Sequence, residues 1–112
     1  MNIVFDGVYK GHRALIVNTF ENNNDLLIAY VELPKSNKLH GVTDLSNYPK
    51  DGVLRRVSFA GELPGEKGFF ISNASQIIPE YADKVDLTFL VTECEELIEY
   101  LIDNNGNVAG GA

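Results

Sequence analysis

The side chains with the most reactive chemistry in this chain are two histidines, His12 and His40, and one cysteine, Cys94. Zinc sites use such residues a few positions apart, whereas these three lie in different segments of the chain. A nucleophilic cysteine needs a neighbouring base or positive charge that lowers its pKa, but Cys94 stands between Glu93 and Glu95. We therefore expect no catalytic residue, no metal site and no cofactor, and we predict that the protein is not an enzyme.

A second group of candidate residues lies in the polar segment 35–52 and at the start of the strand expected after it. A segment of this length with little regular structure is uncommon in a compact domain and is often a binding loop. It combines long polar side chains with an aromatic ring, as contact surfaces do. The candidate partner-binding or ligand-binding residues are Lys38, His40, Asp44, Tyr48, Arg55 and Arg56. The alternative is an ordinary solvent-exposed loop.

The negative charge of the chain is concentrated in its last third. Residues 1–79 contain eight acids and eight bases, whereas residues 80–112 contain eight acids and one base, which accounts for the whole net charge of −7. This argues against contact between that end and phosphate backbones or anionic lipid, so we expect no direct nucleic-acid binding. Glu95, Glu99 and Asp103 are spaced four residues apart and fall on one helix face. Such a face either aids solubility or receives a basic partner.

Length and composition indicate one globular domain. The chain has 112 residues, of which 45% are hydrophobic and 22% charged. No apolar run approaches the roughly 20 residues needed to span a bilayer, so we expect no membrane contact. A lone cysteine and the lack of a signal-peptide pattern predict a cytoplasmic protein. We expect a single α+β domain over residues 1–103 and a flexible tail over residues 104–112.

Alternating apolar residues predict five short strands, bounded by turn formers. Asn22–Asp25 and Pro64–Gly65 have the composition of hairpin turns, which indicates two successive hairpins and hence an antiparallel meander. The expected strands are residues 2–9, 12–20, 26–33, 53–63 and 67–73. An open sheet of this kind has unpaired edges, so a homodimer formed by edge pairing is one expectation.

The last element is an amphipathic helix. From Leu87 to Leu101 apolar residues recur with a period of 3.6 residues, and Asp86 is the expected N-cap. An alternative is a strand over residues 85–91 followed by a shorter helix that Thr92 caps. The preferred fold is α+β: an antiparallel meander of four to five strands with one C-terminal helix packed on one face.

Several motifs occur together in the order of a known family. They are Tyr30–Lys35 (YVELPK), Leu39–Gly41 (LHG), Val57–Gly61 (VSFAG), Phe69–Ile71 (FFI) and Glu93–Leu97 (ECEEL). In this order and spacing the chain, over roughly residues 26–103, resembles a family of small, mostly uncharacterised proteins encoded by phages and prophages. The resemblance implies a phage-type accessory protein that acts in the cytoplasm of a bacterial host cell.

Two departures from the family pattern affect what the resemblance implies. Where the family has His-Gly-Gly, this chain has Leu54-Arg55-Arg56, and where it has Gly-Phe-Asp and a later His, this chain has Ser72–Gln76. Any site that those family residues form is therefore missing here. The leading hypothesis is a non-enzymatic protein that binds a host or phage protein, for example as an inhibitor of bacterial defence. The alternatives are a small-ligand, nucleotide-like binder and an acidic DNA mimic.

Overall fold

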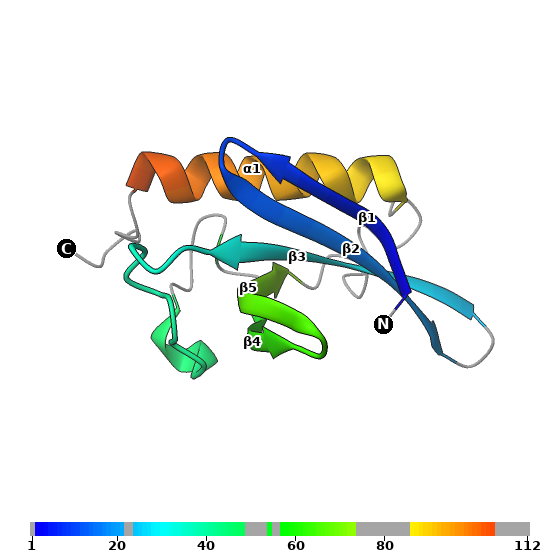
Figure 1. Cartoon of the computed structure of the whole chain (residues 1–112), viewed down its shortest axis with the longest axis horizontal. Helices are drawn as coiled ribbons and strands as arrows, with labels where there is room; N and C mark the ends of the chain where they lie inside the picture. The colour runs from blue at the N-terminus through cyan, green and yellow to red at the C-terminus, as the bar shows by residue number, and fades with distance from the viewer. Residues whose placement is uncertain (1, 22–23, 49–53, 55–56, 74–85, 105–112) are drawn as a thin grey trace.

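The computed structural model describes residues 2–21, 24–48, 54, 57–73 and 86–104, and within these only the backbone of residues 20, 21, 24–26 and 104. The described elements are β1 (Asn2–Tyr9), β2 (His12–Glu21), β3 (Asn24–Leu33), the 3₁₀ helix η1 (Leu45–Asn47), β4 (Val57–Leu63), β5 (Glu66–Asn73) and α1 (Leu87–Asn104). The five strands form one antiparallel sheet, and α1 packs on it against β2 and β3 (Figure 1). The predicted α+β fold is confirmed.

The strand order, β1-β2-β3-β5-β4, differs from the meander that two successive hairpins predicted. β5 rather than β4 pairs with β3, for example through Val31 and Ile71. Burial gives the reason. The consecutive residues Phe69–Ser72 of β5 are all buried, so this strand is covered on both faces, whereas β4 exposes Ser58 and Glu62. A strand with two buried faces is favoured inside a sheet, and a half-polar strand is tolerated at its edge.

The observed strand boundaries agree with the predicted ones for four of the strands and less well for β4. β1 has the predicted bounds, and β2, β3 and β5 differ from prediction by one or two residues. β4 begins at Val57 instead of residue 53; Leu54 is buried, and residues 53, 55 and 56 lie outside the described residues. The predicted tail after residue 104 also lies outside them.

α1 is one continuous helix from Leu87, which rules out a strand at residues 87–91. The carboxylate of Asp86 accepts a hydrogen bond from the N–H of Phe89 at 2.8 Å, as expected of an N-cap. Thr92 lies inside the helix, where its hydroxyl donates to the carbonyl of Thr88, so it caps nothing. The apolar stripe is buried against the sheet through Leu90, Cys94, Leu97, Ile98 and Leu101. Among the described residues no helix is long and apolar enough to cross a membrane.

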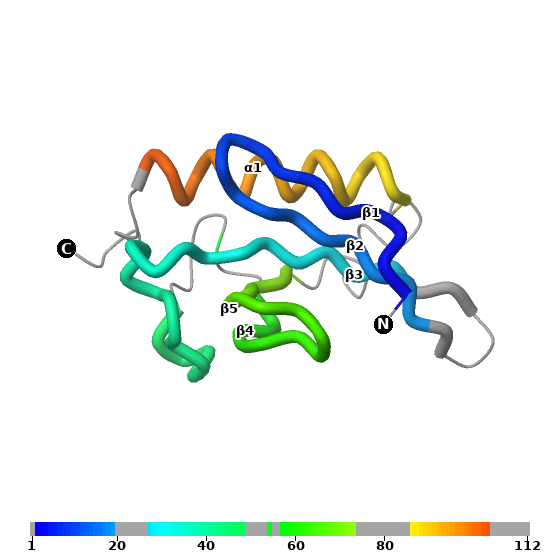
Figure 2. Tube along the Cα trace, viewed as in Figure 1, coloured from blue at the N-terminus to red at the C-terminus, as the bar shows by residue number. Residues whose placement is uncertain are grey.

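The sheet also has a small core on the face away from α1. Leu15, Leu63 and Phe70 are buried together there, and the rings of Tyr30 and Phe59 meet edge to face at 5.5 Å. The β4–β5 hairpin lies on the opposite side of β3 from α1 in the view of Figure 2. Leu63, Phe70 and Phe59 of the hairpin pack with Leu15 and Tyr30, so the hairpin covers part of this face.

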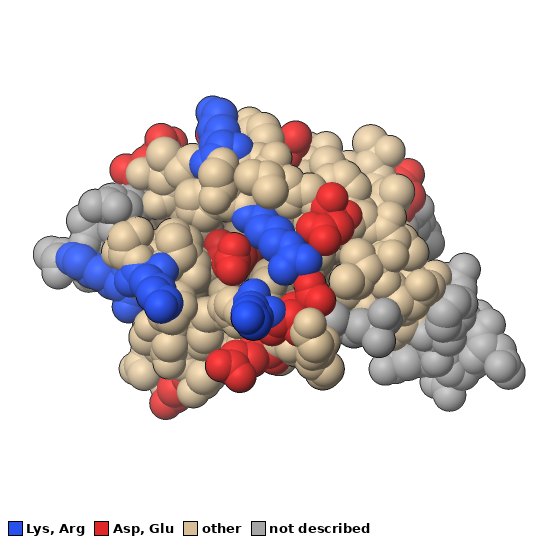
Figure 3. Space-filling model, in the orientation of Figure 1, with Lys and Arg blue, Asp and Glu red and all other residues tan. Residues whose placement is uncertain are grey.

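An ion-pair network ties that hairpin to the other end of the sheet. Arg13 of β2 donates to Glu66 of β5 at 2.5 Å and to Asp6 of β1 at 2.9 Å. Hydrogen bonding by Arg13 lowers the pKa of Asp6. Positive and negative side chains are interspersed over the middle of this face, so no large patch of one sign forms there (Figure 3).

Candidate functional site

The described part of the segment between β3 and β4 is a packed series of turns. Backbone hydrogen bonds run from Asn37 to Pro34, from His40 to Asn37 and from Val42 to Leu39. The side-chain oxygen of Asn37, which is buried, accepts a further bond from the N–H of Leu39 at 2.9 Å. Apolar residues at every third position contact the core: Leu39, Val42, Leu45 and Tyr48. This period of three fits tight turns, and it is the signal in the sequence that would have identified the segment as packed.

Two of the candidate loop residues hold this segment together. Tyr48 is 4% exposed, and its hydroxyl donates to the carbonyl of Val42 at 2.9 Å. Asp44 is the N-cap of η1, because its carboxylate accepts from the N–H of Ser46 at 3.0 Å. The ring of Tyr48 is therefore not available to a ligand.

The remaining candidates near this loop do not form a shared site in the described structure. The His40 ring contacts the Phe69 ring, with centroids 5.3 Å apart, and Lys38 is exposed. Arg55 and Arg56 lie outside the described residues.

The acidic helix face lies on the side of α1 that borders β1. Glu95 stands beside a hollow between α1 and β1, and Glu99 forms an ion pair with Lys10 in the β1–β2 turn. The hydrogen bond to Glu99 raises the pKa of Lys10, and the charge of Asp103 adds to the effect. The three predicted acids are thus brought together, and they form a rim above the outermost strand.

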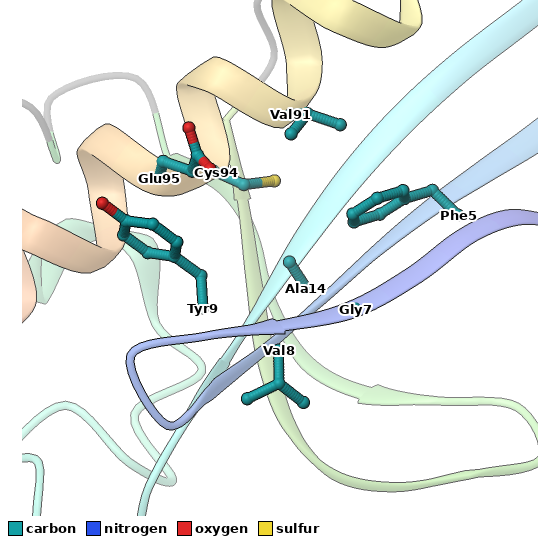
Figure 4. A pocket seen from close by; sticks show the side chains of 8 residues that line it. All are labelled: Phe5, Gly7, Val8, Tyr9, Ala14, Val91, Cys94 and Glu95. Carbon is teal, nitrogen blue, oxygen red and sulfur yellow. The ribbon is translucent and has the colours of Figure 1, made fainter.

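The hollow has a volume of about 100 Å³ and an apolar lining (Figure 4). It lies beside β1 because α1 packs mainly over β2 and β3. In Figure 4 the rings of Phe5 and Tyr9 stand on the helix side of β1 with Gly7 between them, and Val8 points away. A Cβ at Gly7 would meet ring carbon Cζ of Phe5 at 2.9 Å, so the Phe5 ring lies over Gly7. The lining is completed by Ala14, Val91, Cys94 and Glu95.

The Cys94 thiol points into this hollow (Figure 4). It is not an activated nucleophile. Burial, with the charges of Glu93 and Glu95, raises the pKa of Cys94 to about 12. The thiol is therefore neutral at physiological pH and acts as a small apolar side chain.

β1 presents an unprotected strand edge beside the hollow. Lys10 and Gly11, both with positive φ, form a two-residue turn, and Tyr9 pairs with His12 across it. The pair next to such a turn exchanges both backbone hydrogen bonds, and the pattern then alternates along the ladder. The N–H and C=O groups of Asp6 and Val8 therefore point outward, where no described strand pairs with them.

The side chains of β1 do not guard this edge. Val8 is 74% exposed and Val4 is 42% exposed. The one charge inside the strand, Asp6, is turned inward to Arg13, whose Nε and Nη2 lie 3.1 and 2.9 Å from its oxygens. Natural edge strands are usually blunted by outward charges, prolines, bulges or covering elements, and among the described residues the regular part of β1 has none of them. Its single irregularity lies between Ile3 and Phe5.

The opposite edge of the sheet is better protected. β4 has seven residues, and its pairing with β5 shifts register twice, once between Val57 and Phe59 and once between Gly61 and Leu63. η1 packs against it. Bulges and covering elements both oppose strand addition. In the described part of the chain, β1 is therefore the less protected of the two edges.

Among the described residues no three His, Cys, Asp or Glu side chains gather in a way that could hold a metal ion. No family model, curated protein or solved structure matches this chain. The candidate site consists of an apolar hollow and an acidic rim beside the outermost strand, β1.

Proposed function

We propose that this protein is a non-enzymatic binding protein that takes up a strand of another protein along β1. Its target would be a protein of the bacterial cell in whose cytoplasm it acts, and the resemblance to phage-encoded proteins favours a component of host defence. In this role the protein occupies its target and does no chemistry on it.

The observation that supports this function is the exposed edge of β1 beside an apolar hollow. Added strands bind through main-chain hydrogen bonds, and pockets for alternate side chains give such binding its specificity. β1 supplies the outward backbone groups of Asp6 and Val8, and the hollow supplies a pocket on one face. Both halves of a strand-addition site therefore lie side by side.

The test is an affinity capture from bacterial lysate with two variants of the same residue. Val8→Pro removes one outward N–H and leaves the ladder to β2 intact, because proline is tolerated on the free side of an edge strand. Val8→Thr keeps that N–H and the β-branched shape. The wild type and Val8→Thr should recover the same stoichiometric partner, and Val8→Pro should lose it while its circular dichroism stays native.

Two outcomes of that capture would count against the proposal. Retention of the partner by Val8→Pro would show that binding uses another surface. The absence of any stoichiometric partner at micromolar protein would remove the support for a binding protein altogether.

Small-ligand binding is the first alternative, and the described residues support it less well than strand addition. The Tyr48 ring lies in the core, so it cannot contact a ligand together with Lys38, Arg55 and Arg56. A hollow of about 180 Å³ does lie at the base of the loop, lined by His12, Pro34, Ser36, Asn37, Leu101 and Ile102. Stabilisation by any member of a nucleotide panel in a thermal-shift screen would favour this function.

DNA mimicry by the acidic helix is the second alternative. A mimic needs a continuous row of unneutralised charges, whereas Glu99 is paired with Lys10 and Glu95 is only partly exposed. Replacement of Glu95, Glu99 and Asp103 by Gln or Asn should abolish inhibition of a nucleic-acid-binding enzyme if mimicry operates.

A further inference from the structure

We infer that the strand bound at β1 is an extended basic segment that places one large apolar side chain in the hollow opposite Gly7, with a lysine or arginine two residues away on the same face. This inference rests on the proposed function and specifies the chemistry of its partner. Three features carry it: the register at Gly7, the apolar lining and the acidic rim.

The register follows from the hydrogen-bond pattern of β1. Asp6 and Val8 offer their backbone groups outward, so a strand added antiparallel to β1 forms hydrogen-bonded pairs with them and a non-hydrogen-bonded pair with Gly7. Non-hydrogen-bonded pairs bring the two Cα atoms closest, at about 4.5 Å. The partner residue opposite Gly7 points to the α1 side, as Phe5 and Tyr9 do, and would pack beside the Phe5 ring, which lies over Gly7 (Figure 4).

The lining fixes the character of that partner residue. Its surroundings are the Phe5 and Tyr9 rings, Ala14, Val91 and the neutral Cys94 thiol. The hollow measures about 100 Å³, and a cavity of about 150 Å³ is known to hold benzene, so a leucine-sized group fits. Because the lining is apolar, a polar side chain there would lose its water without gaining a partner.

The acidic rim fixes the charge of the neighbours. Partner residues two positions from the inserted side chain share its face and point toward α1, where Glu95 borders the hollow. Glu99 and Asp103 continue the rim toward the β1–β2 turn, where Lys10 pairs with Glu99. Lysine or arginine at these positions would therefore complement an excess of negative charge.

The same rim disfavours a second copy of this chain as the occupant. An antiparallel β1–β1 pair would put both helices on one face of a continuous sheet with their acidic faces toward each other. Glu95, Glu99 and Asp103 of one copy would then oppose the same residues of the other, and like charges held close together destabilise association. The net charge of −7 adds to this repulsion.

The test uses the full chain and short synthetic peptides. The probe is acetyl-Thr-Lys-Thr-Leu-Thr-Lys-Thr-amide, in which leucine and both lysines share one face in either strand direction. Its affinity is measured by calorimetry, and the edge is checked with Val8→Pro. Replacement of the central leucine by alanine should weaken binding about tenfold or more, since it removes a buried apolar side chain. Replacement of both lysines by glutamate should abolish binding.

Matched protein variants locate the contacts. Cys94→Leu fills the hollow and should weaken binding of the leucine peptide about tenfold, whereas Cys94→Ala enlarges it and should shift the preference toward a phenylalanine-centred peptide. Glu95→Gln should reduce the preference for lysine over glutamate peptides, and that preference should be lost in high salt. Glu96→Gln, on an exposed position away from the hollow, should not alter it.

Three results would overturn the inference. In the first, Val8→Pro abolishes binding, but changes to the central leucine, to the lysines or to Cys94 have no effect. Strand addition at β1 would then stand, but the inferred apolar and basic residues of the partner would be wrong. No binding of the leucine–lysine peptide at millimolar concentration would also overturn it. A dimer in sedimentation equilibrium that Val8→Pro dissociates would make a second copy the occupant.

Discussion

Cys94→Leu offers the sharpest check on the hollow, because it should change stability and binding in opposite directions. The thiol is 4% exposed and points into a space of about 100 Å³ beside the Phe5 ring. Leucine has a higher helix propensity than cysteine and adds two methyl groups in that direction. Filling an existing space needs no displacement of the core, so the native fold should be retained.

The expected gain follows from the area and volume involved. Two methyl groups buried at about 0.8 kcal/mol each would contribute about 1.6 kcal/mol. An enclosed void of this size would be worth up to about 2.4 kcal/mol at the cavity coefficient measured in other cores. The hollow is open along the edge of β1, so part of the new side chain stays wet, and we expect a gain of about 1 kcal/mol in the free energy of unfolding.

Urea denaturation followed by circular dichroism measures this gain. With a slope of about 1.5 kcal/mol/M, the midpoint should rise by about 0.7 M at unchanged slope. Cys94→Ala is the control and should lower the midpoint. A loss of 1 kcal/mol or more in Cys94→Leu would contradict the reasoning, since it would mean that the space next to Cys94 is already filled. A stabilised variant that binds the leucine peptide less well would show that the hollow is kept open for use.

Three further predictions concern the packing and its pH dependence. Phe70→Ala should cost about 3–5 kcal/mol in urea denaturation although no described helix covers that face, because Phe70 is fully buried there; a cost below 1 kcal/mol would refute the second core. Tyr48→Phe should cost about 1 kcal/mol, since it leaves the carbonyl of Val42 without its hydrogen bond, and an unchanged midpoint would show that the bond is not made in solution. Burial raises the pKa of Cys94 and of Tyr48, each to about 12, above ordinary values of 9.0 and 10.0. As the pH rises, these groups ionise first in the unfolded state, so the free energy of unfolding should be constant below pH 9 and fall toward pH 12. The double variant Cys94→Ala with Tyr48→Phe should lose less of its free energy of unfolding over the same pH range. An equal loss in the double variant and the wild type would contradict the burial of both groups.

The elements that sequence predicted best are those with a strong period. The stripe from Leu87 to Leu101 and the Asp86 cap favoured one long helix over the alternative of a strand and a shorter helix, and α1 begins where they indicate. The β2–β3 and β4–β5 hairpins were likewise predicted by alternation and turn residues. Local signals of this kind act within a few residues, so they survive in any tertiary arrangement.

The order of β4 and β5 could not be read from the same signals. Adjacent hairpins predict a meander, and only the burial of Phe69–Ser72 on both faces places β5 inside the sheet. That burial depends on the small core around Phe70, which is formed by residues distant in sequence. Strand order is decided by such non-local packing, which alternation within one strand does not encode.

The candidate site was predicted in part. Glu95, Glu99 and Asp103 share a face as predicted, but the sequence alone did not show that this face borders β1. In the loop, residue type alone suggested that Tyr48 and Asp44 contact a partner, because contact surfaces often contain polar and aromatic residues. In the structure both residues instead stabilise the turns of the loop. The hollow depends on where α1 lies across the sheet, and no pattern in the sequence of β1 predicts that position.

Hydrogen exchange at the outward amides of β1 tests the central claim most directly. In the free protein the N–H groups of Asp6 and Val8 should exchange rapidly, while those of Gly7 and Tyr9, bonded to β2, should be protected. Saturation with the leucine–lysine peptide should slow Asp6 and Val8 by about tenfold or more and leave the other two unchanged. Protection of Asp6 and Val8 in the free protein, or no slowing with the peptide, would contradict an open edge that receives a partner strand.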